Sequence, residues 1–236
     1  TMNDSLATLK VRLNAALDAG INGITLSAGL HLSSFKLMSE NKHFREVCLG
    51  FVVSSVRALN LILKRTKYLD RLPDYIVVEG PLAGGHLGFG EDWKNYKVED
   101  IIKEVKSYLK ENNLNIPVFA AGGVFTGGDA TRMIEEVGAD GVQVATRFTI
   151  TQESGLPAPV KSAYLNAKND DIEVNHLSPT GYLMRMLKST PAMKMNVPPN
   201  CEAYGFLLNH GQCPYLKQWN AKMHGAKADE LGEPMC

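Results

Sequence analysis

The stretch YIVVEGPLAGGHLGFG, residues 75–90, joins an apolar run to a single carboxylate and then to a glycine-rich loop. The apolar run 75–78 does not alternate with polar residues, which is typical of a strand buried on both faces of a parallel sheet. Glu79 ends the run, and five glycines and one histidine, His86, follow within eleven residues. Polar and glycine residues at the end of a buried strand indicate a ligand site at the carboxyl end of an α/β sheet.

The same alternation of apolar runs and helical patterns continues on both sides of this stretch. Four more strands are predicted from apolar runs over 23–30, 49–56, 116–123 and 140–148. Helices are predicted between them from the patterns over 33–47, 57–69, 97–113 and 128–138. A further helix is expected at the start of the chain, capped by Asn3 or Asp4. One helix followed by five βα units predicts a parallel sheet.

Two α/β architectures fit this order, the doubly wound open sheet and the TIM (β/α)8 barrel. Small or polar residues end four of the predicted strands, at 27–29, 79–80, 121–123 and 145–147. A barrel gathers all these ends around one mouth, whereas an open sheet gathers only those near its switch point. No G-x-G-x-x-G follows the first strand. We therefore predict an incomplete TIM barrel with strands 4–8 visible, and we expect three more βα units, roughly 80–90 residues, upstream.

The pattern changes after the last predicted strand, and this predicts two parts of the chain. Residues 1–155 are interpreted as the carboxyl-terminal portion of the barrel, and residues 156–236 as a helical extension that packs on it. The extension carries Cys201, His210, Cys213 and His224, but their spacing matches no tight zinc-binding pattern. We predict no metal site.

Composition excludes several classes of function. Lys and Arg together number 25, as do Asp and Glu, so the formal net charge is zero and no nucleic-acid or polybasic membrane surface is expected. No apolar run approaches the ~20 residues of a membrane span. The four cysteines are scattered, which is typical of a reduced cytoplasmic protein.

Two small-residue turns follow the last two predicted strands, where barrels often hold a phosphate. Gly122 and Gly123 carry no side chains, so their N–H groups can approach a phosphate closely. Ala145 and Thr146 are expected opposite, and Thr146 adds a hydroxyl. The alternative interpretation is that these residues only make tight βα turns.

The loop of the opening stretch is expected beside those turns. Backbone over 83–85 can lie flat against a large planar ligand, and Gly84 can donate its N–H to a ring atom. His86 is then expected over the ring, where a histidine of near-neutral pKa can remove or supply a proton. Glu79 either accepts hydrogen bonds from ligand hydroxyls or caps the turn.

The segments VVEGPLAGGHLGF, IPVFAAGGVFTGGDA and GADGVQVATRF resemble the nitronate monooxygenase (2-nitropropane dioxygenase-like) family, which also includes flavin-dependent enoyl-ACP reductases. LSAGLHLSSFKLM and LSPTGYLMRMLKSTPA resemble further segments of the same family. The resemblance runs from the first predicted helix to about Lys194 and implies a (β/α)8 barrel with bound FMN.

Roles for individual residues follow from this resemblance. The phosphate end of FMN is expected on Gly123, Gln143, Val144, Ala145 and Thr146. The ribityl chain and ring are expected along Glu79 and Gly84, with Gly85 and Gly122 as further cofactor-binding candidates. His86 matches the histidine that nitronate-oxidising members are thought to use as a base. Ala145 departs from the glycine usual in the family, and an added methyl group there is expected to crowd a phosphate.

The implied activity is a nitronate monooxygenase, an FMN-dependent oxidoreductase that oxidises alkyl nitronates with oxygen. An FMN- and NAD(P)H-dependent enoyl-thioester reductase is the alternative with the same cofactor. A barrel that binds phosphate ligands without redox chemistry is the second alternative. We expect a small-molecule substrate and a possible homodimer.

Overall fold

The computed structural model describes residues 6–177 and 182–190, and the chain divides into two compact units. The first unit contains residues 6–83 and 88–154. The second contains residues 84–87 and the described residues from Gly155 onward. The predicted boundary after residue 155 lies next to this division after Ser154.

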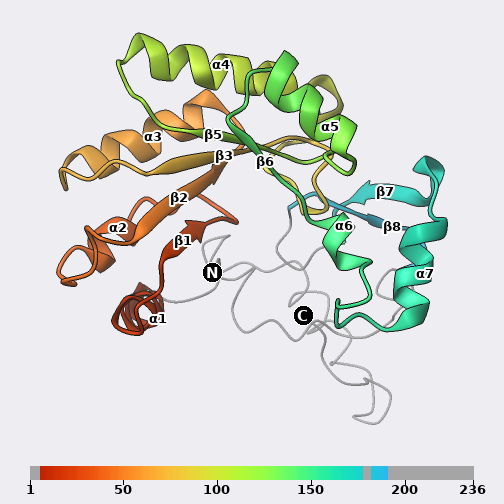
Figure 1. The fold of residues 1–236 in the computed structure, drawn as a ribbon, viewed down its shortest axis with the longest axis horizontal. Helices are drawn as coiled ribbons and strands as arrows, with labels where there is room; N and C mark the ends of the chain where they lie inside the picture. The colour runs from red at the N-terminus through yellow and green to blue at the C-terminus, as the bar shows by residue number, and fades with distance from the viewer. Residues whose placement is uncertain (1–5, 178–181, 191–236) are drawn as a thin grey trace, which may run out of the picture. The chain divides into compact units, whose positions relative to one another are not determined.

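The first unit is built on a sheet of five strands, all parallel, in the order β1-β2-β3-β5-β6 (Figure 1). The strands are β1 (Gly23–Leu26), β2 (Cys48–Val53), β3 (Tyr75–Glu79), β5 (Val118–Ala121) and β6 (Gly141–Gln143). The predicted parallel α/β sheet is confirmed. Within the described residues the five strands do not close on themselves, as expected of an incomplete barrel.

Helices connect the strands, and α3, α4 and α5 lie over one face of the sheet (Figure 1). The helices of this unit are α1 (Leu6–Asp18), α2 (Ser34–Met38), α3 (Val56–Lys67), the 3₁₀ turn η1 (Trp93–Asn95), α4 (Val98–Glu111), α5 (Gly127–Thr131), the π turn η2 (Arg132–Glu136) and α6 (Thr146–Thr149). The predicted apolar face of α4 is buried: Val98, Ile101, Ile102, Val105 and Leu109. Ser55 caps α3 by accepting a hydrogen bond from the Ala58 N–H at 3.2 Å.

One predicted helix is much shorter than expected. The pattern over 33–47 forms only the five residues of α2, followed by turns. Asn41 explains the interruption, because its side-chain oxygen accepts the His43 N–H at 3.0 Å and its amide donates to Asp18 at 2.9 Å. Local hydrogen bonds of this kind compete with helix continuation.

Two predicted strands also end early. The first was expected over 23–30 but stops at Leu26, since Ala28 and Gly29 have φ angles of 62° and 121° that leave the β region. The last was expected over 140–148 but stops at Gln143, which pairs with Ala121, the last residue of β5. The chain then turns into α6.

The sheet face away from the helical core carries two aromatic rings above two glycines. Gly50 lies under the ring of Tyr75, where an added β-carbon would meet ring atoms at 2.2 Å. Gly141 lies under Phe119 in the same way, at 2.6 Å. The two rings pack edge to face with centroids 5.8 Å apart. The two rings cover the part of this face that lies before the carboxyl ends of the strands.

The second unit differs from the helical extension that was predicted. It contains α7 (Ala158–Asn166) and the 3₁₀ turn η3 (Asn169–Asp171), but also an antiparallel sheet in the order β4-β8-β7. Its strands are β4 (Gly85–His86), β8 (Met184–Leu187) and β7 (Ile172–Asn175). The pairing joins the glycine-rich loop to residues about 100 positions later in the chain, which a local pattern does not encode. The cysteines and histidines of the predicted tail lie outside the described residues.

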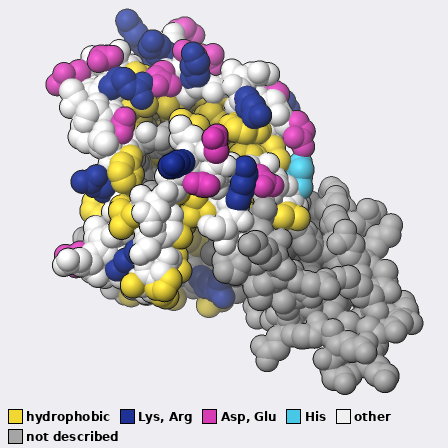
Figure 2. Space-filling view, turned by 90° about the vertical axis from the view of Figure 1, so that its right-hand side faces the viewer, with side chains coloured by type: hydrophobic (Ala, Val, Ile, Leu, Met, Phe, Trp, Pro, Cys, Tyr) yellow, Lys and Arg dark blue, Asp and Glu magenta, His cyan; other side chains and the backbone are white. Residues whose placement is uncertain are grey.

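Acidic and basic side chains are interspersed over the described part of the face in Figure 2. This distribution agrees with the formal net charge of zero. None of the described helices combines the length and the apolar composition that a membrane crossing requires.

Candidate functional site

The carboxyl ends of three neighbouring strands bring Glu79, Ala121 and Gln143 into one row. Glu79 of β3 pairs with Ala121 of β5, and Ala121 pairs with Gln143 of β6. Register partners in parallel strands point to the same sheet face. The neighbouring row of Val78, Ala120 and Val142 belongs to the core under the helices, so the Glu79 row faces away from them. In a barrel this face is the interior.

Glu79 is a half-buried carboxylate without a hydrogen-bond partner among the described residues. Its burial raises its pKa above the usual range, because a charged carboxylate is poorly solvated there. A buried polar group normally finds a partner. The arrangement therefore leaves Glu79 able to accept hydrogen bonds from a ligand.

Gly122 packs against the loop that follows β3. An added β-carbon would lie 2.9 Å from the Gly80 carbonyl oxygen and 2.9 Å from the Ala83 nitrogen, and φ is 86°. Ala83 itself donates to the Gly80 carbonyl at 3.1 Å, which closes the loop. The missing side chain of Gly122 thus makes room for protein backbone, as in the tight-turn interpretation of this glycine.

Three backbone N–H groups at the next turns are open to an anion. The N–H groups of Gly123, Ala145 and Thr146 have no acceptor within the described residues, and all three residues are exposed. Ala145 has φ −116°, a backbone that any residue adopts, and its methyl group faces solvent. The methyl group is accommodated by the protein backbone, and its expected crowding of a phosphate stays a prediction. Free N–H groups that follow neighbouring strand ends favour a phosphate.

The remaining candidates lie in the second unit. His86 is half-buried on β4, and this burial lowers the pKa of its imidazole. The imidazole is therefore mostly neutral at pH 7, the form that can accept a proton. Gly85 has φ 80°, a left-handed value that favours glycine, and neither Gly84 nor Gly85 has a neighbour within 4 Å of an added β-carbon.

Sequence reasoning missed the residues that the fold places beside His86. Met184 pairs with His86 across the β4–β8 ladder, and Asn175 pairs with Met184 across β8–β7. No local pattern identifies them, because β4 has only two residues and its partner strand is far along the chain. Within the described residues no cluster of His, Cys, Asp or Glu could hold a metal ion.

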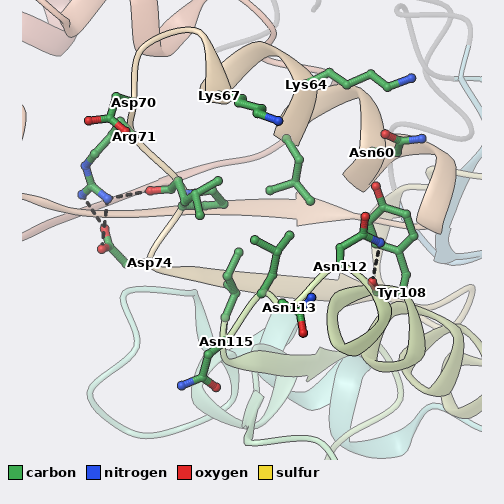
Figure 3. Close-up of a pocket in the computed structure, with 15 residues that line it drawn as sticks. Asn60, Lys64, Lys67, Asp70, Arg71, Asp74, Tyr108, Asn112, Asn113 and Asn115 are labelled. Atoms are coloured by element: carbon green, nitrogen blue, oxygen red, sulfur yellow. Dashed lines mark hydrogen bonds and ion pairs between the residues drawn. The ribbon is translucent and has the colours of Figure 1, made fainter.

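Two cavities of the first unit lie at opposite ends of the strands. One of about 440 Å³ is lined partly by Pro81, Leu82, Gly122 and Gly123, beside the turns described above. A larger one, about 860 Å³, lies where α3 and α4 end and β3 begins (Figure 3). The amino ends of barrel strands serve stability rather than catalysis. The larger cavity is therefore not the candidate functional site, although its volume is greater.

The repeated βα units and the polar, glycine-bearing carboxyl ends of the strands define a protein of the TIM-barrel class. More narrowly, the chain belongs to the nitronate monooxygenase family, whose family model matches residues 8–212.

Two curated relatives are called probable nitronate monooxygenases. The relative from Staphylococcus haemolyticus is 35% identical over 133 residues, which cover 53% of this chain and 36% of the relative. The relative from Staphylococcus saprophyticus is 32% identical over 124 residues, 52% of this chain and 34% of the relative. The chain thus spans about a third of the length of these relatives.

Solved structures share the fold. A FabK mutant from Thermotoga maritima has a TM-score of 0.60 at 24% identity, covering 81% of this chain and 54% of that one. Nitroalkane oxidase from Streptomyces ansochromogenes has a TM-score of 0.57 at 20% identity, covering 75% and 48%. The enoyl reductase domain of MlnA from Bacillus amyloliquefaciens has a TM-score of 0.60 at 14% identity, covering 94% and 54%. At these identities the likeness concerns the fold alone.

Proposed function

We propose that the protein is an FMN-dependent nitronate monooxygenase that oxidises alkyl nitronates with molecular oxygen and uses His86 as its base. The observation that carries the proposal is the half-buried imidazole of His86, whose pKa is lowered by burial, in a chain of the nitronate monooxygenase family. The neutral imidazole is the protonation state that can act as a base.

The open backbone groups of the first unit fit the phosphate of FMN. We assign the phosphate to the N–H groups of Gly123, Ala145 and Thr146, with Gln143 and Val144 in the strand end that leads to this turn. Gly122 supports this site by letting the loop after β3 pack closely.

The sugar-alcohol and ring parts of FMN have separate candidates. The unpartnered carboxylate of Glu79 suits the ribityl hydroxyls, since it can accept two hydrogen bonds or more. Gly84 and Gly85 leave bare backbone for the flavin ring.

His86 performs the proton transfer in this mechanism. The C–H bond next to the nitro group breaks, the proton passes to the imidazole, and the electron pair moves into the nitro group to give the nitronate. Bound FMN would supply the electron transfer from the nitronate to oxygen. A substrate that already is a nitronate does not need the proton transfer.

The enoyl-thioester reductase alternative needs the imidazole of His86 as a proton donor rather than as a base. Reduction of an enoyl thioester requires a proton donor, and an imidazole with a lowered pKa is a poor donor at pH 7. This observation favours nitronate oxidation.

Absorbance and oxygen uptake together test the proposal. The purified protein should show a flavin absorbance band and consume oxygen with the nitronate of 1-nitropropane. NAD(P)H consumption with an enoyl thioester and no oxygen uptake with nitronates would select the reductase. Absence of bound flavin after incubation with FMN would exclude both flavin-dependent activities and leave the barrel that binds phosphate ligands without redox chemistry.

A further inference from the structure

The antiparallel sheet of the second unit sets Met184 directly beside His86. The Leu87 N–H donates to the Leu183 carbonyl at 2.8 Å, so residues 87 and 183 form a hydrogen-bonded pair. Hydrogen-bonded and non-hydrogen-bonded pairs alternate along an antiparallel ladder. His86 and Met184, the next pair, are therefore a non-hydrogen-bonded pair, in which the two side chains lie closest and share one face.

The same face continues across β8 and β7. Asn175 is the register partner of Met184, and Glu173 is the partner of Met186. Residues two apart on a strand share a face, so Glu173 and Met186 lie with His86. The Asn175 amide is held at both ends: it donates to Glu173 at 3.3 Å and accepts the Leu177 N–H at 2.9 Å. Met184 is therefore the neighbour of His86 on this face, and the paired residues Met186 and Glu173 lie farther along it.

The charges of this sheet are divided between its two faces. Arg185 pairs with Gly85 and Val174 and therefore points to the opposite face. Within the three strands, Glu173 is the only acidic or basic side chain on the face of His86. Lys188 lies beyond the end of β8, farther from His86 than Glu173 along the sheet.

We propose that Met184 and Glu173 set the substrate class: the site prefers nitronates with an unbranched, uncharged alkyl chain and disfavours those with a second carboxylate. Met184 is an unbranched and flexible apolar side chain, which adapts to a linear alkyl group. The Glu173 carboxylate repels a second negative charge on the substrate. The inference rests on the proposed nitronate oxidation.

Relative specificity measures this directly. Oxygen uptake is followed with nitronates of 1-nitropropane, 1-nitrohexane and 3-nitropropionate, and kcat/KM is compared between variants that bind FMN equally. Met184→Ala should lower kcat/KM for the hexyl nitronate about tenfold and for the propyl nitronate less than about twofold, mainly through KM. Met186→Ala, on the same face but farther from His86, is the matched control.

Glu173→Gln tests the charge while keeping an oxygen that can accept the Asn175 hydrogen bond. It should raise kcat/KM for the 3-nitropropionate nitronate relative to the propyl nitronate by about fivefold. Asp170→Asn, in η3 of the same unit, removes an equal charge and should leave the ratio unchanged. If Met184→Ala and Glu173→Gln turn over normally and the kcat/KM ratios of the hexyl and 3-nitropropionate nitronates to the propyl nitronate do not change, this inference alone is refuted. Absence of turnover with every nitronate refutes the proposed function, and this inference with it.

Discussion

Gly122 and Gly80 hold the loops after β5 and β3 in backbone contact: an added β-carbon on Gly122 would stand 2.9 Å from the Gly80 carbonyl oxygen. Gly80 is restricted as well, because its own added β-carbon would meet the Val98 side chain at 2.5 Å. The two turns that border the proposed phosphate site therefore depend on each other through bare backbone.

Gly122→Ala should destabilise the protein by about 2–4 kcal/mol, since the methyl group adds a backbone clash to a left-handed φ of 86°. Urea unfolding of the FMN-free protein measures the change. Gly127→Ala is the control, because Gly127 begins α5 and an added β-carbon there meets nothing within 4 Å. Equal effects of the two substitutions would contradict the packing role of Gly122.

Much of the first unit could be predicted from local pattern. The helical spacing of Val98, Ile101 and Leu109 identified α4 because a helix buries one stripe of residues whatever it packs against. The unbroken apolar run of β3 identified a strand covered on both faces. The ends of elements were less predictable: Ala28 adopts φ 62°, which an apolar run does not signal, and Asn41 bonds to Asp18 of α1, 23 residues earlier in the chain.

Glu79→Gln should stabilise the FMN-free protein and weaken FMN binding. The folded-state pKa of Glu79 is raised by burial, so its contribution to stability is greatest at low pH and declines as pH rises through that pKa. Removing the ionisation should raise the free energy of unfolding at pH 7 by on the order of 1 kcal/mol. Loss of a charged acceptor should weaken FMN roughly tenfold.

Flavin titration and urea unfolding at pH 5 and pH 8 check this pair of effects. The stabilisation by Glu79→Gln should be larger at pH 8 than at pH 5. Glu104→Gln, on the exposed side of α4, serves as a control with the same change of charge. A variant that loses stability at pH 8 while binding FMN normally would assign Glu79 a structural role only.

His86→Asn should lower kcat/KM for neutral nitroalkanes by about 10²–10⁴ and affect preformed nitronates much less, because the latter need no proton removal. In the wild type, kcat/KM for nitroalkanes should stay high at neutral pH and fall as pH drops through the lowered pKa of His86. Oxygen uptake from pH 5 to pH 8 measures both. His43→Asn, a histidine beside Glu46, is the control. A nitroalkane profile that is unchanged in His86→Asn would end the assignment of this base.

The candidate site was less accessible to sequence reasoning than the fold. Glu79 and Gly123 stood out because residues at strand ends share one edge of a parallel sheet. Met184 did not stand out, because its position beside His86 comes from an antiparallel pairing between segments far apart in the chain. For Gly122 the contact distances fit the tight-turn interpretation, and its contact with a cofactor stays a prediction.

Two aspartates in equivalent positions should govern the acid stability of the first unit. Asp74 precedes β3 and accepts the Leu49 N–H of β2 at 2.7 Å, and Asp140 precedes β6 and accepts the Val118 N–H of β5 at 2.7 Å. Each is also paired with a cation, Arg71 at 2.6 Å and Lys106 at 2.8 Å. Burial alone raises both pKa values, but these hydrogen bonds and cations hold them below the usual range.

A carboxylate whose folded-state pKa is lowered contributes stability above its unfolded pKa, about 3.9, and loses it as pH falls through the folded value. Asp74→Asn and Asp140→Asn should each lower the free energy of unfolding at pH 7 by about 1.5–3 kcal/mol. The difference from the wild type should shrink on acidification below about pH 4, where the wild-type carboxylates take up protons. Urea unfolding from pH 7 to pH 3 measures this, with Asp170→Asn as the control. A pH-independent deficit in both variants would show that the lost contacts do not depend on the charge of the two carboxylates.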